Sequence, residues 1–346
     1  MSNDQLKMTN EGIIKLLDNL KGKANLLAPQ KDEYGDLYLK KVTDASKVII
    51  KHFKPLMPVV REVLFGQIEE MIKFKKTQGG AALESIDASE ETIIFGLPTC
   101  DLEGILYNDV FFGQREFSDF YYNQAREKLT LISIGCTTPP NETCFCASMG
   151  HGPIAEDGFD LQLTNVGKET FFVNVGSKKG AKIAADNKTL FEPATEADLN
   201  AFNEVKNKAS LLPVDKKINK ARALDKMGRE ALDEKMIIEI SDRCISCGAC
   251  NYTCPTCTCF NVVDHAKDGD GTRKRVLDSC ILGGYFRMAG GHNPKPKKDE
   301  RTRNRYFCKF EWDKEKFGDS GCLGCGRCLD ACPVKIDIKE VIGSLS

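Results

Sequence analysis

The chain lacks any continuous apolar run of the roughly 20 residues that a membrane-spanning helix needs. Its first residues, MSNDQLKMTNEG, contain neither the basic nor the apolar stretch of a secretory signal, so we expect a cytoplasmic protein. The net charge of −1 at pH 7 is low, which argues against nucleic-acid binding. The sequence also has no G-x-G-x-x-G or Walker A pattern, and therefore no nicotinamide or flavin fingerprint.

Cysteine, by contrast, is abundant, with 16 residues among 346. Cytosolic thiols stay reduced, so this number indicates metal ligands rather than disulfides. Eight of the cysteines form two copies of the pattern Cys-x2-Cys-x2-Cys-x3-Cys-Pro. The first run is Cys244, Cys247, Cys250 and Cys254, followed by Pro255, and the second is Cys322, Cys325, Cys328 and Cys332, followed by Pro333. This spacing binds [4Fe–4S] clusters in bacterial ferredoxins, where the fourth cysteine of each run ligates the other cluster.

The duplicated pattern therefore predicts two [4Fe–4S] clusters with crossed ligands. Cluster A is assigned to Cys244, Cys247, Cys250 and Cys332, and cluster B to Cys322, Cys325, Cys328 and Cys254. A pair of zinc sites is the alternative, because two Cys-x2-Cys hooks make a tetrahedral thiolate site. Zinc does not require the Cys-Pro step, so the pattern favours iron–sulfur clusters.

The other eight cysteines fall into two groups. Cys100 and Cys136 each follow a predicted strand, and Cys144 and Cys146 follow a Pro139-Pro140 turn. Strand ends in α/β folds usually place ligands on one side of the sheet, so this group predicts a third cluster, with buried thiols or zinc as alternatives. The second group lies between the two runs and predicts either a fourth metal site or buried thiols beside clusters A and B. Its members are Cys257, Cys259, Cys280 and Cys308.

The predicted fold is α+β. Residues 1–205 are expected to form a mixed α/β domain, followed by a charged connecting helix or linker over 206–235 and an α-helical two-cluster ferredoxin domain over 236–346. The long separation of the cysteine runs favours the helical ferredoxin type. In the first domain we expect a helix with Asn10 as its N-cap and a helix over 101–112, with strands at 92–95, 129–134, 159–164 and 170–175.

Four histidines and one basic segment complete the candidate residues. His151 and His292 lie in glycine-rich turns, where satisfying the loop backbone is the ordinary role and metal or cofactor binding the alternative; the other two are His52 and His265. The segment 294–307, PKPKKDERTRNRYF, is strongly basic. A solvated face is its default interpretation, and docking of an acidic partner or offset of cluster charge are the alternatives.

Several blocks together resemble the β subunit of cytosolic [NiFe] hydrogenases of the sulfhydrogenase type and the A-type subunit of anaerobic sulfite reductase. The blocks include LLDNLKGKANLLAP, FGLPTCDLEGI, CISCGACNYTCPTCTC, AGGHNPKPKKDERTRNRYFCK and CLGCGRCLDACP. All 16 cysteines fall in blocks that match that family, which strengthens the metal assignment for Cys100, Cys136, Cys144 and Cys146. The eight-residue step from Cys136 to Cys144, with its two prolines, departs from the family pattern.

The resemblance implies a non-catalytic electron-transfer subunit of an oxidoreductase complex. In that family, a partner subunit carries FAD, a [2Fe–2S] cluster and an NAD(P)H site. The other partner is a [NiFe] hydrogenase, a sirohaem sulfite reductase or an electron-bifurcating flavoprotein. The competing hypothesis is a catalytic subunit that reduces sulfur or sulfite at an open iron site near Cys100 and Cys146.

Overall fold

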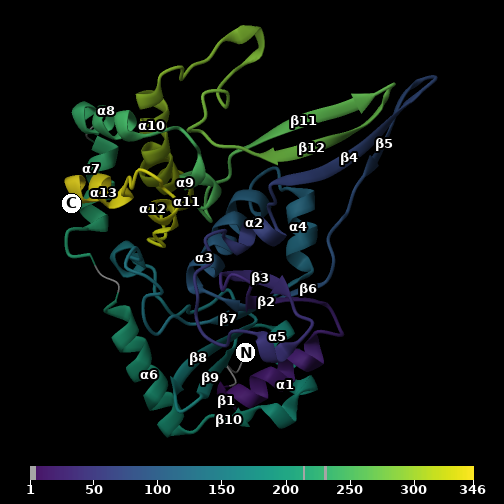
Figure 1. Ribbon diagram of the computed structural model, residues 1–346, viewed down its shortest axis with the longest axis vertical. Helices are drawn as coiled ribbons and strands as arrows, with labels where there is room; N and C mark the ends of the chain where they lie inside the picture. Colours follow the sequence, from purple (N-terminus) through teal and green to yellow (C-terminus); the bar gives the residue numbers. More distant parts are fainter. Residues whose placement is uncertain (1–4, 213–214, 230–231) are drawn as a thin grey trace. The chain divides into compact units, whose positions relative to one another are not determined.

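The computed structural model describes residues 5–212, 215–229 and 232–346, and the chain forms two compact units (Figure 1). Unit 1 consists of Met1–Pro55, Ser89–Leu106 and Ala125–Val214, and unit 2 of Leu56–Ala88, Tyr107–Gln124 and Asp215–Ser346. Two segments within the first predicted domain, 56–88 and 107–124, thus belong to unit 2. Residues 213–214 and 230–231 of the predicted connecting segment lie outside the described residues.

Unit 1 is built on an eight-stranded sheet with the strand order β10-β1-β9-β8-β7-β6-β2-β3. The strands are β1 (Gln5–Thr9), β2 (Asn25–Lys31), β3 (Leu37–Lys41), β6 (Thr92–Leu97), β7 (Leu129–Ile134), β8 (Leu161–Gly167), β9 (Thr170–Val175) and β10 (Glu192–Pro193). The neighbours β2, β6, β7 and β8 run parallel, and the other pairs are antiparallel. β6 and β7 are buried along their whole length, as their apolar sequences require in a parallel core. The predicted mixed sheet is confirmed.

The helices of unit 1 are short and amphipathic. They are α1 (Asn10–Leu20), α5 (Lys178–Asp186) and α6 (Glu196–Ser210), while α3 (Thr99–Asn108) and α4 (Phe120–Glu127) have residues in both units. α1 buries Ile13, Leu16, Leu17 and Leu20 in the core of the sheet. The predicted cap at Asn10 is wrong by one residue, because Thr9 Oγ1 accepts the hydrogen bond from Gly12 N at 3.1 Å. The predicted helix over 101–112 stops at Asn108, where a π turn (Asp109–Gly113) follows.

Unit 2 combines helices with a four-stranded antiparallel sheet of order β11-β12-β4-β5. Its helices are α2 (Val59–Val63), α7 (Lys220–Arg229), α8 (Glu234–Arg243), α9 (Ala249–Tyr252), α10 (Lys298–Phe307), α11 (Asp313–Phe317), α12 (Arg327–Asp330) and α13 (Ile338–Leu345), with a π turn at Cys308–Trp312. Its strands are β4 (Ile68–Thr77), β5 (Gly80–Ser85), β11 (Phe260–Lys267) and β12 (Asp270–Leu277). Among the described helices, none is long and apolar enough to cross a membrane.

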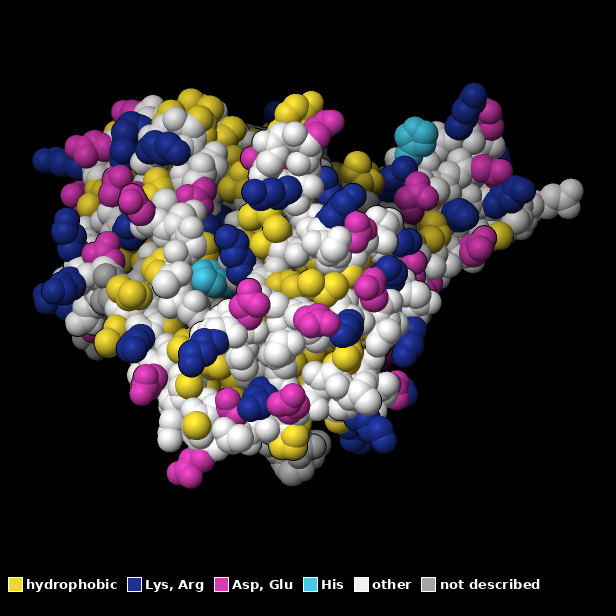
Figure 2. Space-filling view, turned by 60° about the horizontal axis from the view of Figure 1, so that its bottom comes forward, with side chains coloured by type: hydrophobic (Ala, Val, Ile, Leu, Met, Phe, Trp, Pro, Cys, Tyr) yellow, Lys and Arg dark blue, Asp and Glu magenta, His cyan; other side chains and the backbone are white. Residues whose placement is uncertain are grey.

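The prediction that residues 236–346 are purely helical is wrong at residues 260–277. These residues form the β11–β12 hairpin, which turns at Asp268-Gly269 with φ values of 56° and 94°. Positive φ at both central residues is the requirement of a tight hairpin turn, and Asp-Gly satisfies it. β12 also pairs with β4, nearly 200 residues earlier in the chain, and such a distant partner cannot be read from local spacing. On the face shown in Figure 2, acidic and basic side chains are interspersed, in keeping with the low net charge.

Candidate iron–sulfur sites

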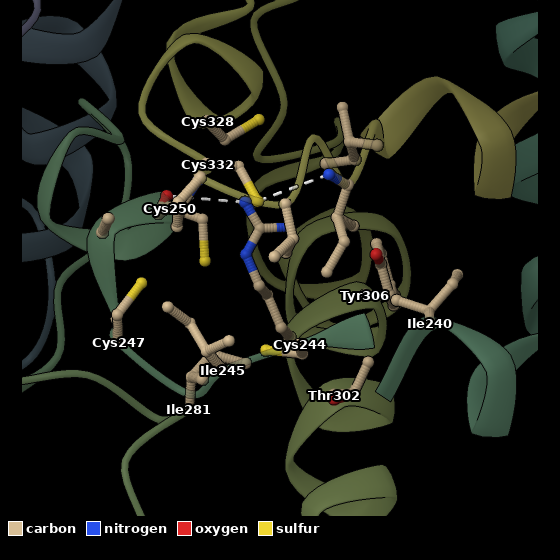
Figure 3. A pocket seen from close by; sticks show the side chains of 17 residues that line it. Ile240, Cys244, Ile245, Cys247, Cys250, Ile281, Thr302, Tyr306, Cys328 and Cys332 are labelled. Carbon is tan, nitrogen blue, oxygen red and sulfur yellow. Dashed lines mark hydrogen bonds between the residues drawn. The ribbon is translucent and has the colours of Figure 1, made fainter. Parts of the chain in front are cut away.

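Cysteines from both runs line a single pocket in unit 2 (Figure 3). Cys244, Cys247 and Cys250 come from the first run, and Cys332 comes from the second. This is the set that the sequence assigns to cluster A. Cys328 lies at the same pocket, whose walls are otherwise mostly apolar, with Ile240, Ile245, Ile281, Tyr306, Val334 and Ile338. An apolar wall limits the access of water, which is one of the means by which a protein sets the properties of a metal centre.

Each run folds into the same short loop-and-helix unit. Gly248, with φ 78°, immediately precedes α9, and Gly326, with φ 73°, immediately precedes α12. Other residues rarely adopt this left-handed conformation, which explains why glycine follows the second cysteine of each run. A Cβ at Gly248 would also lie 3.1 Å from Ser279 Cβ. The pattern Cys-x2-Cys-x2-Cys therefore depends on glycine as well as on cysteine.

Backbone amides of these loops point at sulfur. Ser246 N donates to Cys244 Sγ at 3.3 Å, and Ile336 N donates to Cys332 Sγ at 3.3 Å. Hydrogen bonds of this kind stabilise thiolate charge and are among the factors that set the reduction potential of an iron–sulfur cluster.

The residues predicted to hold cluster B interact electrostatically. Burial raises the pKa of Cys322 to about 12, and the nearby Cys325 and Cys254 add to this shift. Burial also raises the pKa of Cys328, and Cys254 again contributes. Cys254 of the first run thus lies close to cysteines of the second run, as the crossed assignment requires. Because such thiols hold their protons firmly, metal binding at this site must release protons.

Three buried cations contact the segments that carry these cysteines. The exposed fractions are 3% for Arg61, 6% for Arg305 and 2% for Lys309. Arg61 Nη2 donates to the carbonyl oxygen of Cys254 at 3.1 Å and also to that of Cys257. Arg305 Nε donates to Asn251 Oδ1 at 3.1 Å, and Lys309 Nζ donates to Thr256 Oγ1 at 2.8 Å.

Lys309 has a nearby carboxylate, since Asp313 Oδ2 lies 3.8 Å from its Nζ, whereas the acceptors of the Arg61 and Arg305 hydrogen bonds are neutral. The Nε and Nη1 atoms of Arg61 are buried and have no hydrogen-bond partner in the described part of the chain. Burial by itself lowers the pKa of Arg305, but the negative charge of neighbouring groups when ionised, Cys250 and Cys328 first among them, raises it well above its ordinary value. A buried charge is costly without a compensating charge. A cluster with four thiolate ligands is anionic, so the residues present fit such a group.

The basic segment 294–307 is therefore not a simple solvated face. Arg301 and Arg305 are buried, and Arg301 donates to the carbonyl oxygens of Ile281, Lys295 and Pro296. The default interpretation is wrong for these two residues. The alternative, in which the segment offsets cluster charge, agrees with the position of Arg305.

Comparison with known proteins gives two matches. Residues 243–336 match the family model described as a 4Fe-4S dicluster domain, a range that contains both cysteine runs. The β subunit of sulfhydrogenase 2 from Pyrococcus furiosus is 33% identical over 275 residues, which cover 79% of this chain and 78% of that protein. This chain belongs to the sulfhydrogenase β-subunit family. The dicluster domain indicates [4Fe–4S] clusters, whose chemistry is electron transfer.

The four cysteines between the runs interact with one another, and Cys259 is the member that the other three share. Cys257 is hydrogen-bonded to Cys254, whereas Cys259 is hydrogen-bonded to Cys280. The Cys280 hydrogen bond, opposed by burial, is the main reason that the pKa of Cys259 falls to about 6. Cys308 lies beside Lys309 and Asp313 and also interacts electrostatically with Cys259. Cys257, Cys280 and Cys308 thus each interact with Cys259, and the fourth metal site stays a prediction.

The geometry also bears on zinc as the alternative metal. Among the described residues, no three Cys, His, Asp or Glu side chains converge as ligands of one ion. In a [4Fe–4S] cluster each thiolate binds a different iron atom, so the sulfurs are farther apart than around one zinc ion.

In unit 1, hydrogen bonds connect the loops that carry the remaining cysteines. The Pro153 carbonyl oxygen accepts from Thr99 Oγ1 at 2.7 Å and from Cys136 N at 2.8 Å, which ties the start of α3, with Cys100, to the end of β7. The carbonyl oxygen of Cys146 accepts from His151 N at 3.1 Å. The loops that follow β6 and β7 therefore meet at the carboxyl edge of the sheet, as the third predicted site requires.

The histidines of this family member differ in their surroundings. His151 Nδ1 lies 3.7 Å from Glu103 Oε2 on α3, and its buried Nε2 has no hydrogen-bond partner within the described residues. His52 Nε2 lies 3.2 Å from Thr138 Oγ1, and His265 and His292 are exposed. Cys144 Sγ donates to Asn141 Oδ1 at 3.1 Å.

Proposed function

We propose that this chain relays electrons within a multisubunit oxidoreductase. The observation that carries the proposal is the pocket of unit 2, in which Cys332 of the second run faces Cys244, Cys247 and Cys250 of the first. Such crossing puts two clusters next to each other. When bound, each cluster supplies reversible one-electron transfer, and two neighbouring clusters provide a path for single electrons.

The residues of the chain have distinct tasks in this proposal. The eight cysteines of the two runs hold clusters A and B, and Cys100, Cys136, Cys144 and Cys146 hold a third cluster. Arg61, Arg305 and Lys309 balance the cluster charge, because each is buried beside a cysteine-bearing segment. The apolar wall of the pocket excludes water. The four cysteines between the runs are the candidates for a fourth metal site.

The proposed partners follow from the family. The relative is named as the β subunit of a sulfhydrogenase, which supports assembly with other subunits. We place the chain between a subunit with FAD, a [2Fe–2S] cluster and an NAD(P)H site and a hydrogenase, sulfite reductase or electron-bifurcating flavoprotein. We place it in the cytoplasm, because this many thiol ligands require a reducing compartment.

The test uses the complex purified without oxygen. We expect about eight irons per chain for two clusters, about twelve for three and about sixteen for four. Cys247→Ala and Cys325→Ala should each remove one cluster from unit 2 and abolish NAD(P)H-linked electron flow. Val262→Ala, at an exposed position of β11, is the matched control and should retain both.

Two results would contradict the relay. One is full NAD(P)H-linked activity in the complex after either cysteine substitution. The other is reduction of sulfur or sulfite by the isolated chain with an artificial electron donor, which would favour a catalytic iron site near Cys100 and Cys146. Inactivity alone, with activity restored by the partners, supports the relay.

A further inference from the structure

Two of the buried cations stand four residues apart and reach two different cysteines of the first run, Cys250 and Cys254. Arg305 lies in α10, and Lys309 lies in the π turn that follows it. Residues separated by four positions are neighbours on one helix face. α10 and the π turn that follows it thus place two positive charges near the predicted ligands of clusters A and B.

Arg305 reaches the first run through Asn251. Its Nε donates to Asn251 Oδ1 at 3.1 Å, and the same oxygen lies 3.7 Å from Cys250 Sγ. Its Nη2 also donates to the carbonyl oxygen of Cys250 at 3.5 Å. Both acceptors are neutral, so the guanidinium charge is directed to Cys250 without an intervening carboxylate. Arg305 also interacts with Cys328, at the edge of the same pocket.

Lys309 reaches Cys254 through Thr256. Its Nζ donates to the carbonyl oxygen of Thr256 at 2.9 Å and to Thr256 Oγ1 at 2.8 Å. Thr256 Oγ1 in turn lies 3.3 Å from Cys254 Sγ. A carboxylate accompanies this cation, because Asp313 Oδ2 lies 3.8 Å from Nζ and Asp313 is only 5% exposed. The charge that Cys254 experiences is therefore partly offset.

We propose that Arg305 and Lys309 are positioning residues that set the reduction potentials of the two clusters, Arg305 chiefly that of cluster A and Lys309 chiefly that of cluster B. The proposal rests on the proposed function, in which Cys250 and Cys254 are ligands of different clusters. A fixed positive charge stabilises the reduced cluster more than the oxidised one, because reduction adds negative charge. Buried charges act strongly, since water and salt screen them little.

Three substitutions are expected to change the reduction potentials of the clusters in different directions. Arg305→Met lowers the potential of cluster A, with a smaller decrease for cluster B through Cys328. Lys309→Met lowers the potential of cluster B, and this decrease is smaller than the Arg305→Met effect on cluster A because Asp313 offsets Lys309. Asp313→Asn raises the potential of cluster B. General damage to the fold has no reason to produce opposite signs in these variants.

The measurement is an anaerobic redox titration of the full chain, followed by electron paramagnetic resonance, with iron content determined for every sample. The signal of cluster A is the one that Cys247→Ala removes. Arg305→Lys and Lys309→Arg retain the charge and should keep potentials near those of the unmodified protein. Arg303→Met is the matched control, because Arg303 lies on the same helix and donates to the carbonyl oxygen of Leu232.

Three results would overturn the proposal. The first is an equal shift of both cluster potentials in Arg305→Met or in Lys309→Met, and the second is no shift of potential in one of these variants. The third is a shift in Arg305→Lys or Lys309→Arg as large as in the methionine variants. If a methionine variant loses iron, the potentials of Asp313→Asn and of the charge-retaining variant test the proposal instead. A lowered or unchanged cluster B potential in Asp313→Asn then contradicts the proposal. The proposed function is judged separately: the signals that Cys247→Ala and Cys325→Ala remove, with at least about eight irons per chain, support it even when the potentials do not move.

Discussion

Arg275 provides a test of how the sheet of unit 2 is attached to its helical part. This β12 residue is 1% exposed and donates to Glu69 Oε2 at 2.6 Å and to Asp119 Oδ2 at 2.5 Å. Its guanidinium also lies 5.1 Å from the ring centre of Phe65, 5.4 Å from that of Phe112 and 5.6 Å from that of Phe260. Arg275→Met removes the charge that both carboxylates share.

The cost follows from the burial of the three charged groups. Breaking a buried ion pair typically destabilises a protein by about 3–5 kcal/mol, because the remaining charge is left uncompensated. The side chains of Glu69 and Asp119 are 26% and 19% exposed, so water compensates for part of the loss. We therefore expect about 3 kcal/mol, the low end of the range. For a unit of this size, that loss corresponds to a decrease in Tm of roughly 6–12 °C.

The same strand provides the control. Arg273 lies two residues earlier and also pairs with a carboxylate, but its side chain is 49% exposed and that of Asp264 is 45% exposed. Arg273→Met should leave Tm nearly unchanged, because water and salt screen an exposed pair. The assay is thermal unfolding of the cluster-containing full chain at a fixed scan rate. A decrease for Arg275→Met no larger than that for Arg273→Met would refute the reasoning.

Arg275→Met should also release iron faster to a chelator. The ring of Phe65 lies 4.7 Å from the Arg61 guanidinium and 5.1 Å from that of Arg275. Arg61 in turn donates to the carbonyl oxygen of Cys254. The two arginines thus support the cysteine loop through a shared ring. An unchanged rate of iron release, together with the expected decrease in Tm, would limit the role of Arg275 to the sheet.

Three further predictions concern the ligand crossing and a helix cap. Cys332→Ser should remove the same paramagnetic signal as Cys247→Ala; loss of the signal that Cys325→Ala removes would refute the crossed assignment. Thr195→Ala should lower the unfolding free energy by about 1 kcal/mol in denaturant titrations, because Thr195 Oγ1 caps α6 at Asp198 N; an unchanged midpoint would refute this. Hydrogen bonds from Thr195 lower the pKa of Asp198 to about 2. The ionised Asp198 carboxylate therefore stabilises the folded chain fully above the ordinary carboxyl pKa, and this contribution disappears as the pH falls through about 2. Asp198→Asn should remove this acid dependence of the unfolding free energy.

Local sequence patterns predicted the parts of the fold that depend on neighbours in the chain. The strands at Leu129–Ile134 and Thr170–Val175 have the bounds that their apolar patterns predicted. The N-terminal helix also formed where its apolar period indicated, with a one-residue error in the cap. These features follow from side-chain periodicity and short-range hydrogen bonds, which a sequence displays directly.

The roles of the cations could not be predicted in the same way. The composition of 294–307 suggests an exposed basic face, yet Arg305 is buried beside Asn251 while Lys297 is exposed. Charge density along a chain does not specify which side chains of a helix face inward. The β11–β12 hairpin did carry a local signal, the Asp268-Gly269 turn, and only the pairing of β12 with the distant β4 has no local pattern.

The chemistry of this protein can be read from the cysteine spacing and the Cys-Pro steps, because they restrict which metal group two runs of cysteines can hold. Which residues share a site depends on the packing of the folded chain. It brings Cys332 to the pocket of the first run, pairs Cys259 with Cys280, and puts Arg305 and Lys309 next to different cysteines. These are contacts between segments distant in the chain, and they depend on the packing of the whole unit rather than on any local pattern.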